Sequence, residues 1–457
     1  MRLCLSPPDD NTPAWRLAIG AVRAKGGLAV QQVRRAGRRY SRLIAAGVAW
    51  ALALTLAGCG EEREAASLKL IAVEYRDQSG NSSQRYWDRL VREFELDNPG
   101  ISVDVDVYPW NEVDKKIADL VKAGKAPDMA QAGAFASYAA QGKLYTADEL
   151  LSVPIQAAFV PVLADAGQVQ RTQYGMPFVA STRVLFYNKD LLEKAGIPNP
   201  PKTWTQLAKD AQALKAAGVK VPYALPLGPE EPHAEALNWM LSGGGGYTYI
   251  GRYTIDSVEN VRTFEWLRDE LVGKGLTNPD PASFNRKDAF DAFTRGDVAM
   301  LNGHPTLIQL SRKFGIDFGM APLPGKGGQS KATTGVVDWM MAFKQNGHRE
   351  QVGKFLDFVY SDKNVLKYAD QYGLLPVTVA TSEAMRANES KQAIWEFLDQ
   401  LPTAQSFPVG KPSWGPMVTK LQSTIGTAVS KDGDPGRVLG TLQREAKAIE
   451  ESAQETS

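Results

Sequence analysis

The chain has 457 residues, and its 52 basic and 51 acidic residues leave it nearly neutral. The charge is unevenly distributed. The first 58 residues carry nine Lys and Arg against two Asp, and the rest carries 43 basic and 49 acidic residues. A mildly acidic body argues against nucleic-acid binding, which needs clustered basic charge. The three His and two Cys show no zinc-ligand spacing, and no cofactor motif is present.

The basic N-terminal segment leads into a short apolar run, residues 43–57, which ends in Leu56-Ala57-Gly58-Cys59. A positive segment, a short apolar segment and small residues before a cleavage point are typical of a secretory signal. Leu-Ala-Gly-Cys resembles the lipobox of bacterial lipoproteins, which implies removal of residues 1–58 and a lipid on Cys59. A plain signal peptide with an incidental Cys is the alternative. Residues 59–67 are expected to form a tether.

The first part of the body alternates between strand and helix patterns. Residues 101–107 alternate strictly between apolar and polar side chains, as a half-exposed strand does. Asn98-Pro99-Gly100 ends the helix before it. Strands that alternate with helices along the chain in this way predict parallel βαβ units. The expected elements are a strand at 68–72, a helix at 86–94, a strand at 101–107, a helix at 111–121 and a short strand with its loop at 126–131.

The next part begins with a polar run, residues 181–183, followed by a strand of β-branched, apolar and aromatic residues at 184–187. Asn188 or Asp190 can cap the helix that follows, and Gly196 and Pro198 end it. Four glycines at 243–246 lack the Lys and Ser or Thr of a phosphate-binding loop. Further helices are expected at 204–217, 236–241, 257–271, 351–360 and 365–371 and toward residue 449, with strands at 221–225, within 296–302 and within 334–343.

Several of these segments resemble extracellular solute-binding proteins of ABC transporters, the family that contains maltose- and oligosaccharide-binding proteins. The resemblance covers about residues 68–450. Its motifs are Tyr174-Gly-Met-Pro177 followed by Tyr187-Asn-Lys-Asp190 and by Pro200–Leu207, then Phe290-x-x-Phe293 with Gly296–Met300, and Phe94-Glu-x-x-Asn-Pro-Gly-Ile-x-Val103.

The resemblance implies an α/β fold of the two-lobe periplasmic-binding-protein type (type II). Each lobe would be a mainly parallel sheet flanked by helices, and a hinge would join the lobes. The chain would cross between the lobes near Pro177 and return near 318–325. The N-terminal lobe would then comprise 68–179 and 330–376, and the C-terminal lobe 180–329 and 377–457.

The resemblance also implies a function. The protein would be a monomer that captures a mono- to oligosaccharide and delivers it to ABC permease subunits and their ATPase. It would be lipid-anchored outside the cytoplasm on the bacterial cell membrane. A polyol, amino sugar, glycoside or oligopeptide ligand is the nearest alternative. The alternative from a different functional class is a lipoprotein glycoside hydrolase that uses Glu230, Glu231 or Asp338. The sequence leaves it open, because the distance between two catalytic carboxylates cannot be read from sequence.

Aromatic and polar side chains suit a sugar, because flat rings cover its C–H faces and polar groups pair with its hydroxyls. Trp87, Trp266 and Trp395 lie on apolar helical faces and are expected in the core, whereas Trp110, Trp239, Trp339 and Trp414 have no such explanation. Trp339 and Trp414 are expected to stack on the ligand from opposite lobes. The expected ligand contacts are Tyr75, Gln78, Asn81, Gln131, Ser181, Arg183, Glu235, Trp239, Asn302, His304, Asp338, Trp339, Tyr372 and Trp414.

Overall fold

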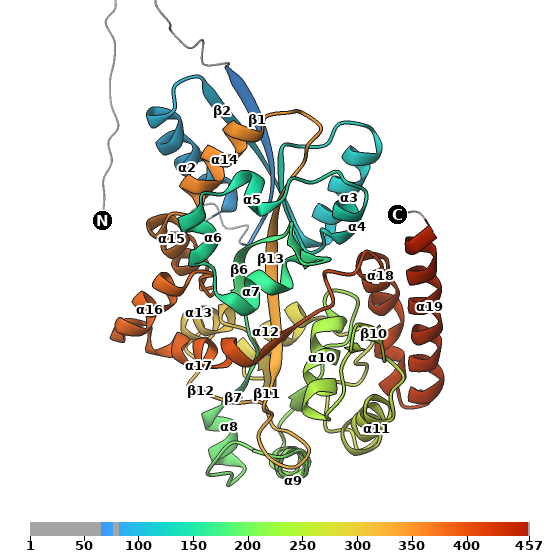
Figure 1. The fold of residues 1–457 in the computed structure, drawn as a ribbon. Coiled ribbons are helices and arrows are strands. Elements are labelled where there is room, and N and C mark those ends of the chain that lie inside the picture. Colours follow the sequence, from blue (N-terminus) through green and yellow to red (C-terminus); the bar gives the residue numbers. More distant parts are fainter. Residues whose placement is uncertain (1–64, 76–81, 456–457) are drawn as a thin grey trace, which may run out of the picture. The chain divides into compact units, whose positions relative to one another are not determined.

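Two β-sheets organise the computed structural model, which describes residues 65–75 and 82–455. These residues belong to one compact unit, Glu64–Ser457. Cys59, Gln78, Asn81 and the expected leader lie outside the described residues. Figure 1 labels the helices and strands in chain order. Among the described residues, no helix has both the length and the apolar character that a membrane crossing requires.

The first sheet has six strands in the order β14-β13-β3-β1-β2, with β6 also paired to β13. β1 pairs in parallel with β2 and β3, as the βαβ pattern predicts. β13 is antiparallel to β3 and β6 and parallel to β14. The strands are β1 (Ala66–Val73), β2 (Ile101–Tyr108), β3 (Met129–Ala132), β6 (Met176–Ser181), β13 (Thr333–Ala342) and β14 (Ala404–Ser406).

β1 begins two residues before the expected strand, inside the segment expected to be a tether. Ala66 is buried and its N–H donates to the carbonyl oxygen of Gly100 at 2.9 Å. Paired with Ile101, it extends the parallel ladder to the first residue of β2. Ala66 and Ser67 are therefore part of the folded sheet.

The second sheet has four strands in the order β12-β7-β11-β8. β11 is parallel to β8, but β7 is antiparallel to both β11 and β12. The prediction of a mainly parallel sheet is therefore wrong here. β7 carries the chain away from the first sheet and β12 carries it back, so these neighbours must run in opposite directions. The strands are β7 (Val184–Asn188), β8 (Val221–Ala224), β11 (Val298–Gly303) and β12 (Phe318–Ala321).

The two connections between the sheets are tied together by hydrogen bonds. β6 ends at Ser181 and β7 begins at Val184, which leaves two residues for the first connection. The N–H of Arg183 donates to Thr333 Oγ1 at 3.2 Å, and the Thr333 hydroxyl donates to the Arg183 carbonyl at 2.8 Å. Thr333 is the first residue of β13, so the outgoing and returning strands are joined where they meet.

Amphipathic helices pack near the first sheet. α2 contacts β2, and α3 contacts β1. Ser82 caps α2 by accepting from the Arg85 N–H, and Gly124 follows α3 with a φ of +67°. The short helices α4–α7 and the hairpin β4–β5 were not predicted. The elements are α2 (Ser83–Asp97), α3 (Trp110–Lys122), α4 (Ala136–Ala140), α5 (Ala147–Leu150), α6 (Val153–Ala158), α7 (Pro161–Ala166), β4 (Gln168–Val169), β5 (Thr172–Gln173), α14 (Arg349–Val359) and α15 (Asp362–Tyr372).

Most of the remaining helices follow the predicted order, but α13, α16 and the hairpin β9–β10 were not predicted, and the expected final helix is divided into α18 and α19. Asn188 caps α8 by accepting from the Leu191 N–H at 3.1 Å. The expected helix at 257–271 becomes π-helical at Leu267–Val272. The elements are α8 (Lys189–Lys194), α9 (Trp204–Ala216), α10 (Pro232–Ser242), β9 (Thr248–Tyr249), β10 (Arg252–Tyr253), α11 (Val258–Trp266), α12 (Arg286–Thr294), α13 (Thr306–Lys313), α16 (Val379–Ala387), α17 (Gln392–Gln400), α18 (Trp414–Thr424) and α19 (Pro435–Glu455).

The C-terminal part of the chain serves both sheets. β14 lies in the segment expected to belong to the second lobe, yet it pairs in parallel with Thr333–Gly335 at the start of β13. α18 then contacts α10 and α19. β3 pairs only with Trp339–Ala342 of β13. The first residues of β13, Thr333–Gly335, therefore have a free strand edge on which β14 pairs.

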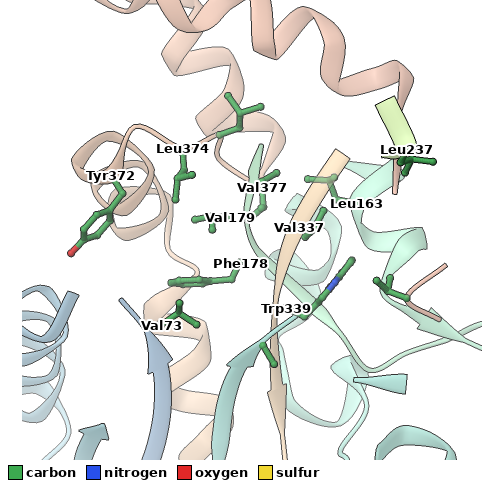
Figure 2. Packing of buried hydrophobic residues seen from close by; sticks show 14 of the residues in the cluster. Val73, Leu163, Phe178, Val179, Leu237, Val337, Trp339, Tyr372, Leu374 and Val377 are labelled. Carbon is green, nitrogen blue, oxygen red and sulfur yellow. The ribbon is translucent and has the colours of Figure 1, made fainter. Parts of the chain in front are cut away.

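Buried side chains fill the region around β6 and β13 (Figure 2). The ring of Phe178 on β6 stacks on Trp87 of α2 at 5.6 Å and lies 4.6 Å from Tyr368 of α15. Val337 and Trp339, on β13, are also buried. Because this core holds α2, α15 and the two strands together, it fixes the positions from which polar side chains project.

Candidate functional site

A first polar group forms where β1 and β3 end. Gln131, on β3, is fully buried; its side-chain carbonyl accepts from the Val73 N–H at 3.2 Å. Its amide donates to the Tyr75 hydroxyl at 2.7 Å and lies 3.5 Å from Asp338 Oδ2 on β13. Burial raises the pKa of Asp338 well above its ordinary value. The structure thus brings together three of the predicted contact residues: Tyr75, Gln131 and Asp338.

Aromatic rings surround Tyr75. Its ring centre is 5.4 Å from Tyr372, 5.8 Å from Tyr368 and 6.3 Å from Trp110. Tyr372 was predicted as a contact, and its ring is buried. Trp110, the first residue of α3, is 38% exposed and meets Tyr75 edge to face. Trp110 is therefore the ring of this group that is most exposed to solvent.

An acid lies beside this open ring. Asp114 is one helical turn after Trp110, and its carboxylate accepts from the Gly133 N–H at 3.3 Å. A side chain at position 133 would approach both Asp114 and the Trp110 ring. Asp114 reaches solvent, yet the surrounding protein desolvates its carboxyl and raises its pKa to about 6. Asp114 was not predicted, because an acid on an amphipathic helix looks like part of a solvated face.

A second polar group contains Ser181 and Arg183 at the connection between the sheets. Arg183 is 5% exposed; its guanidinium donates to Ser181 Oγ at 3.0 Å and to Glu231 at 2.9 Å. Burial lowers the pKa of Arg183. Burial alone would raise the pKa of Glu231, but Arg183 and Arg286 together lower it below the ordinary value. Arg183 is thus engaged on two sides by protein groups.

Arg286 extends this group to the predicted residue His304. Arg286 forms ion pairs with Glu230 and Glu231, and its Nη1 lies 3.0 Å from His304 Nε2. Burial, followed by the two nearby arginines, lowers the pKa of His304 well below its ordinary value. The neutral imidazole accepts from Arg286 at Nε2, so its Nδ1–H donates to Thr306 Oγ1 at 2.9 Å.

These two groups lie along one face of the β6–β13 pair. Ser181 is opposite Val336, and Asp338 is opposite Val179. Residues two apart on a strand share a face, so Ser181 and Asp338 are diagonal neighbours on it. Ser181 thereby links the Gln131–Asp338 group to the Arg183–Glu231 group.

Three other predicted residues form a sealed group on the second sheet. The Trp239 indole N–H donates to Glu235 at 2.7 Å, and the Asn302 amide donates to the same oxygen at 2.9 Å. Trp239 packs against both Trp204 and Trp266, at 5.8 and 5.9 Å, and these two rings stack on each other at 4.9 Å. Burial raises the pKa of Glu235 to about 7. The space beside Trp239 and Asn302 has no room for a solvent molecule, so these side chains have no ligand-accessible surface here.

Trp339 and Trp414 are also covered by protein. Trp339 is 1% exposed and packs against Phe135 at 5.2 Å. Trp414 is 2% exposed, stacks on Phe407 at 5.5 Å and lies 5.2 Å from Tyr247. Neither indole offers a free face in this structure, and the two are not brought together. Trp87 is buried as expected, while Trp266 and Trp395 are half-buried against the core.

Metal binding has no support in the part of the chain that the structure describes, where no group of three or more His, Cys, Asp or Glu is placed to hold an ion. One cavity of about 520 Å³ opens beside α8, lined by Tyr187, Leu192, Ile197 and neighbouring residues. It contains none of the predicted contact residues.

Comparison with known proteins agrees with this architecture. The family model described as bacterial extracellular solute-binding protein matches residues 79–366. A binding protein of Brucella abortus (strain 2308) is 26% identical over 402 residues, covering 87% of this chain and 96% of the relative. The sn-glycerol-3-phosphate-binding periplasmic protein of Salmonella typhimurium is 28% identical over 368 residues, covering 73% and 80%.

Solved structures show the same fold. The maltose-bound MalE3 protein of T. maritima has a TM-score of 0.72 at 20% identity, covering 84% of this chain and 99% of that one. The Lmo0181 protein of Listeria monocytogenes, in complex with cycloalternan, has a TM-score of 0.69 at 22% identity, covering 84% and 98%. The chain has the α/β periplasmic-binding-protein fold. It belongs to the bacterial extracellular solute-binding proteins, and acts as the solute-binding component of an ABC importer rather than as an enzyme.

Proposed function

We propose that this importer component captures a neutral carbohydrate. The observation that carries the proposal is the open surface around Trp110, where an exposed indole after β2 meets Tyr75 after β1, and Asp114 lies nearby against Gly133 after β3. A flat ring can cover the C–H face of a sugar. The Asp114 carboxylate can accept a hydrogen bond from a hydroxyl, and the Gln131 and Asp338 side chains follow behind Tyr75. Ligands of α/β sheets sit beyond the carboxyl ends of strands.

The ligands of the structural relatives support the same class. Two of them hold maltose and cycloalternan, and a third, from Thermotoga lettingae, holds α-D-tagatose. Their fold is shared with this chain, and the open aromatic surface supplies the chemistry that a sugar needs. Polyols, amino sugars, glycosides and oligopeptides remain the neighbouring classes that an assay must include.

Glycerol 3-phosphate is the second candidate, because one relative binds it at 28% identity. A phosphate needs unpaired cations or free N–H groups. Arg183 and Arg286 are already paired with Glu231 and Glu230 in the described structure, and Asp114 adds negative charge beside Trp110. An anionic ligand would have to displace two carboxylates, so the arrangement favours a neutral solute.

We propose that two lobes close on the solute, with the expected bounds 68–179 and 330–376, and 180–329 and 377–457, except that β1 begins at Ala66 and that β6 up to Ser181 and β14 belong to the first sheet. The connections β6–β7 and β12–β13 would form the hinge. A solute that contacts both sides stabilises the closed state only through contacts that the open state lacks. The Arg183–Thr333 hydrogen bonds would hold the two hinge strands in register during that motion.

A lipid anchor at Cys59 completes the proposal, with residues 1–58 as its signal. The motif Leu56–Cys59 follows an Arg-rich apolar leader. Cys59→Ala should release the protein from the membrane fraction or leave it unprocessed. A membrane fraction and a mature mass that are identical to those of the parent would exclude the anchor.

A thermal-shift panel tests the ligand class directly. The purified protein is heated with maltose, cellobiose, tagatose, glucosamine, sorbitol, glycerol 3-phosphate and a tripeptide. A bound solute raises Tm by mass action, with about 2.7 kcal/mol of stabilisation at a hundredfold excess over Kd. We expect a neutral sugar to give the largest shift. A shift with glycerol 3-phosphate alone would transfer the assignment to the second candidate.

A further inference from the structure

Two short hairpins contain the unusual backbone conformations of this chain. The two-residue turn Gln170-Arg171 joins β4 to β5, and Ile250-Gly251 joins β9 to β10. Gln170, Arg171 and Ile250 have φ values of 50°, 68° and 47°, and within 65–75 and 82–455 no other non-glycine residue has a positive φ. Such turns usually contain Asn or Gly, because a Cβ atom disfavours the left-handed region.

Ile250 is the least expected of the three. A β-branched residue with positive φ is a conformational outlier. Its side chain is also apolar and 82% exposed, and that of the adjacent Tyr249 is 71% exposed. Asn at position 250 would relieve both the strain and the apolar exposure. Folding of the free protein therefore gives no reason for Ile250, whereas contact with a partner does.

Both hairpins are attached to one segment, residues 407–414. Gly410 lies against the carbonyl oxygen of Gln168, too close for any side chain at 410. At the other end, the Ser413 hydroxyl lies 3.0 Å from the Tyr253 hydroxyl, and the Trp414 ring lies 5.2 Å from Tyr247. The segment 407–414 therefore connects the two hairpins through packed contacts.

The hairpins also belong to different parts of the fold. The β4–β5 hairpin leads directly into β6 of the first sheet. The β9–β10 hairpin follows α10, whose Trp239 packs on Tyr223 of the second sheet at 5.6 Å. A partner that touches both turns would contact elements of both sheets. Such a contact suits a partner protein that must distinguish between arrangements of the two sheets.

We propose that the two turns, Gln170-Arg171 and Tyr249-Ile250-Gly251, dock on the permease of the importer. The partner surface would offer an apolar patch for Tyr249 and Ile250 and an acidic group for the exposed Arg171. The proposal rests on the importer role and is independent of which solute is bound. A second copy of the chain or a lipid surface could also cover Tyr249 and Ile250, and the test separates these occupants.

The test places a photo-crosslinking amino acid, p-benzoylphenylalanine, at position 250 or 171 of the full-length protein in its source bacterium. Position 96 is the control, because Leu96 on α2 is 83% exposed in an ordinary helix. After irradiation, adducts in the membrane fraction are identified by mass spectrometry. We expect permease adducts from 250 and 171 and none from 96. Adducts with the protein itself or with lipid alone would overturn the proposal.

A substitution separates docking from folding. In the Ile250→Asn variant, loss of the strain should raise Tm by about 1–3 °C. The yield of permease adduct from position 171 should fall at least fivefold in the same variant. Leu96→Asn should change neither the adduct yield nor the backbone strain. An unchanged adduct yield in a folded Ile250→Asn protein would contradict the proposal, whatever the thermal-shift panel shows about the solute.

Discussion

Two aromatic groups in this protein have similar composition and different accessibility. The first contains Trp110 and Tyr75 beside Asp114, and solvent reaches its indole. The second contains Trp239 against Trp204 and Trp266 beside Glu235, and protein covers Trp239, Trp204 and Glu235. Rings and an acid together therefore do not identify a ligand surface. Position decides: Trp110 begins a helix beyond a strand end, whereas Trp239 lies mid-helix under two other helices.

The largest expected difference between the groups is in stability. Trp239→Ala should lower the free energy of unfolding by about 3–5 kcal/mol, because it leaves a cavity beside two packed rings and removes a donor to Glu235. Trp110→Ala should change it by less than about 1 kcal/mol, since the ring is partly exposed. Urea unfolding of both variants measures this. Equal losses of stability would remove the distinction between a sealed and an open group.

The sealed acid should make stability depend on pH. Glu235 has a folded pKa of about 7, above its unfolded value, so the folded state holds the proton more tightly. The stabilisation that follows from this raised pKa is therefore fully present below about pH 4.5. It is lost as the pH rises through 7, and the free energy of unfolding falls by roughly 3 kcal/mol.

Glu235→Gln is the matched variant for this effect, because an amide has the same shape and does not titrate. Unfolding free energies at pH 5 and pH 7.5 should show a smaller fall with pH in Glu235→Gln than in the parent. The two proteins would behave alike if Glu235 were not buried as described.

The open acid should instead make binding depend on pH. Asp114 has a pKa of about 6, so protonation below this pH removes a charged acceptor for a sugar hydroxyl. The affinity should fall about three- to tenfold between pH 7.5 and pH 5, since a hydrogen bond to a charged group is the stronger kind. Asp114→Asn should bind with an affinity that is nearly constant over this range. Calorimetric titration at the two pH values would show this, and a parent without pH dependence would argue against Asp114 as a contact.

Much of the fold was predictable from local patterns. The strand Val184–Asn188 is largely buried and consists mainly of β-branched, apolar and aromatic residues, and the helix cap and glycine stop are at the expected places. The family motif fixed the order of elements around it. The direction of β7 and β12 was missed, because strand pairing depends on contacts between distant segments. β14 was missed for the same reason, since three residues carry little pattern of their own.

The site was less predictable than the fold. Tyr75 and Gln131 come together as the strand-end argument expects, whereas Asp338 joins them from within β13 and Tyr372 from the end of α15. Trp339 and Trp414 are covered by Phe135 and Phe407, and no local pattern shows that distant rings will cover them. Asp114 was missed because its partner, the N–H of Gly133, lies 19 residues away along the chain.

The central claim is that Trp110 forms the sugar-binding surface. The measurement is calorimetric titration of the parent, Trp110→Ala and Phe314→Ala with the sugar that gives the largest thermal shift. Phe314 is the control, because its ring is 57% exposed and lies outside both aromatic groups. Loss of a stacking ring costs on the order of 1–3 kcal/mol, so Trp110→Ala should bind about five- to 150-fold more weakly, while Phe314→Ala binds like the parent. A folded Trp110→Ala protein with parental affinity would contradict the account.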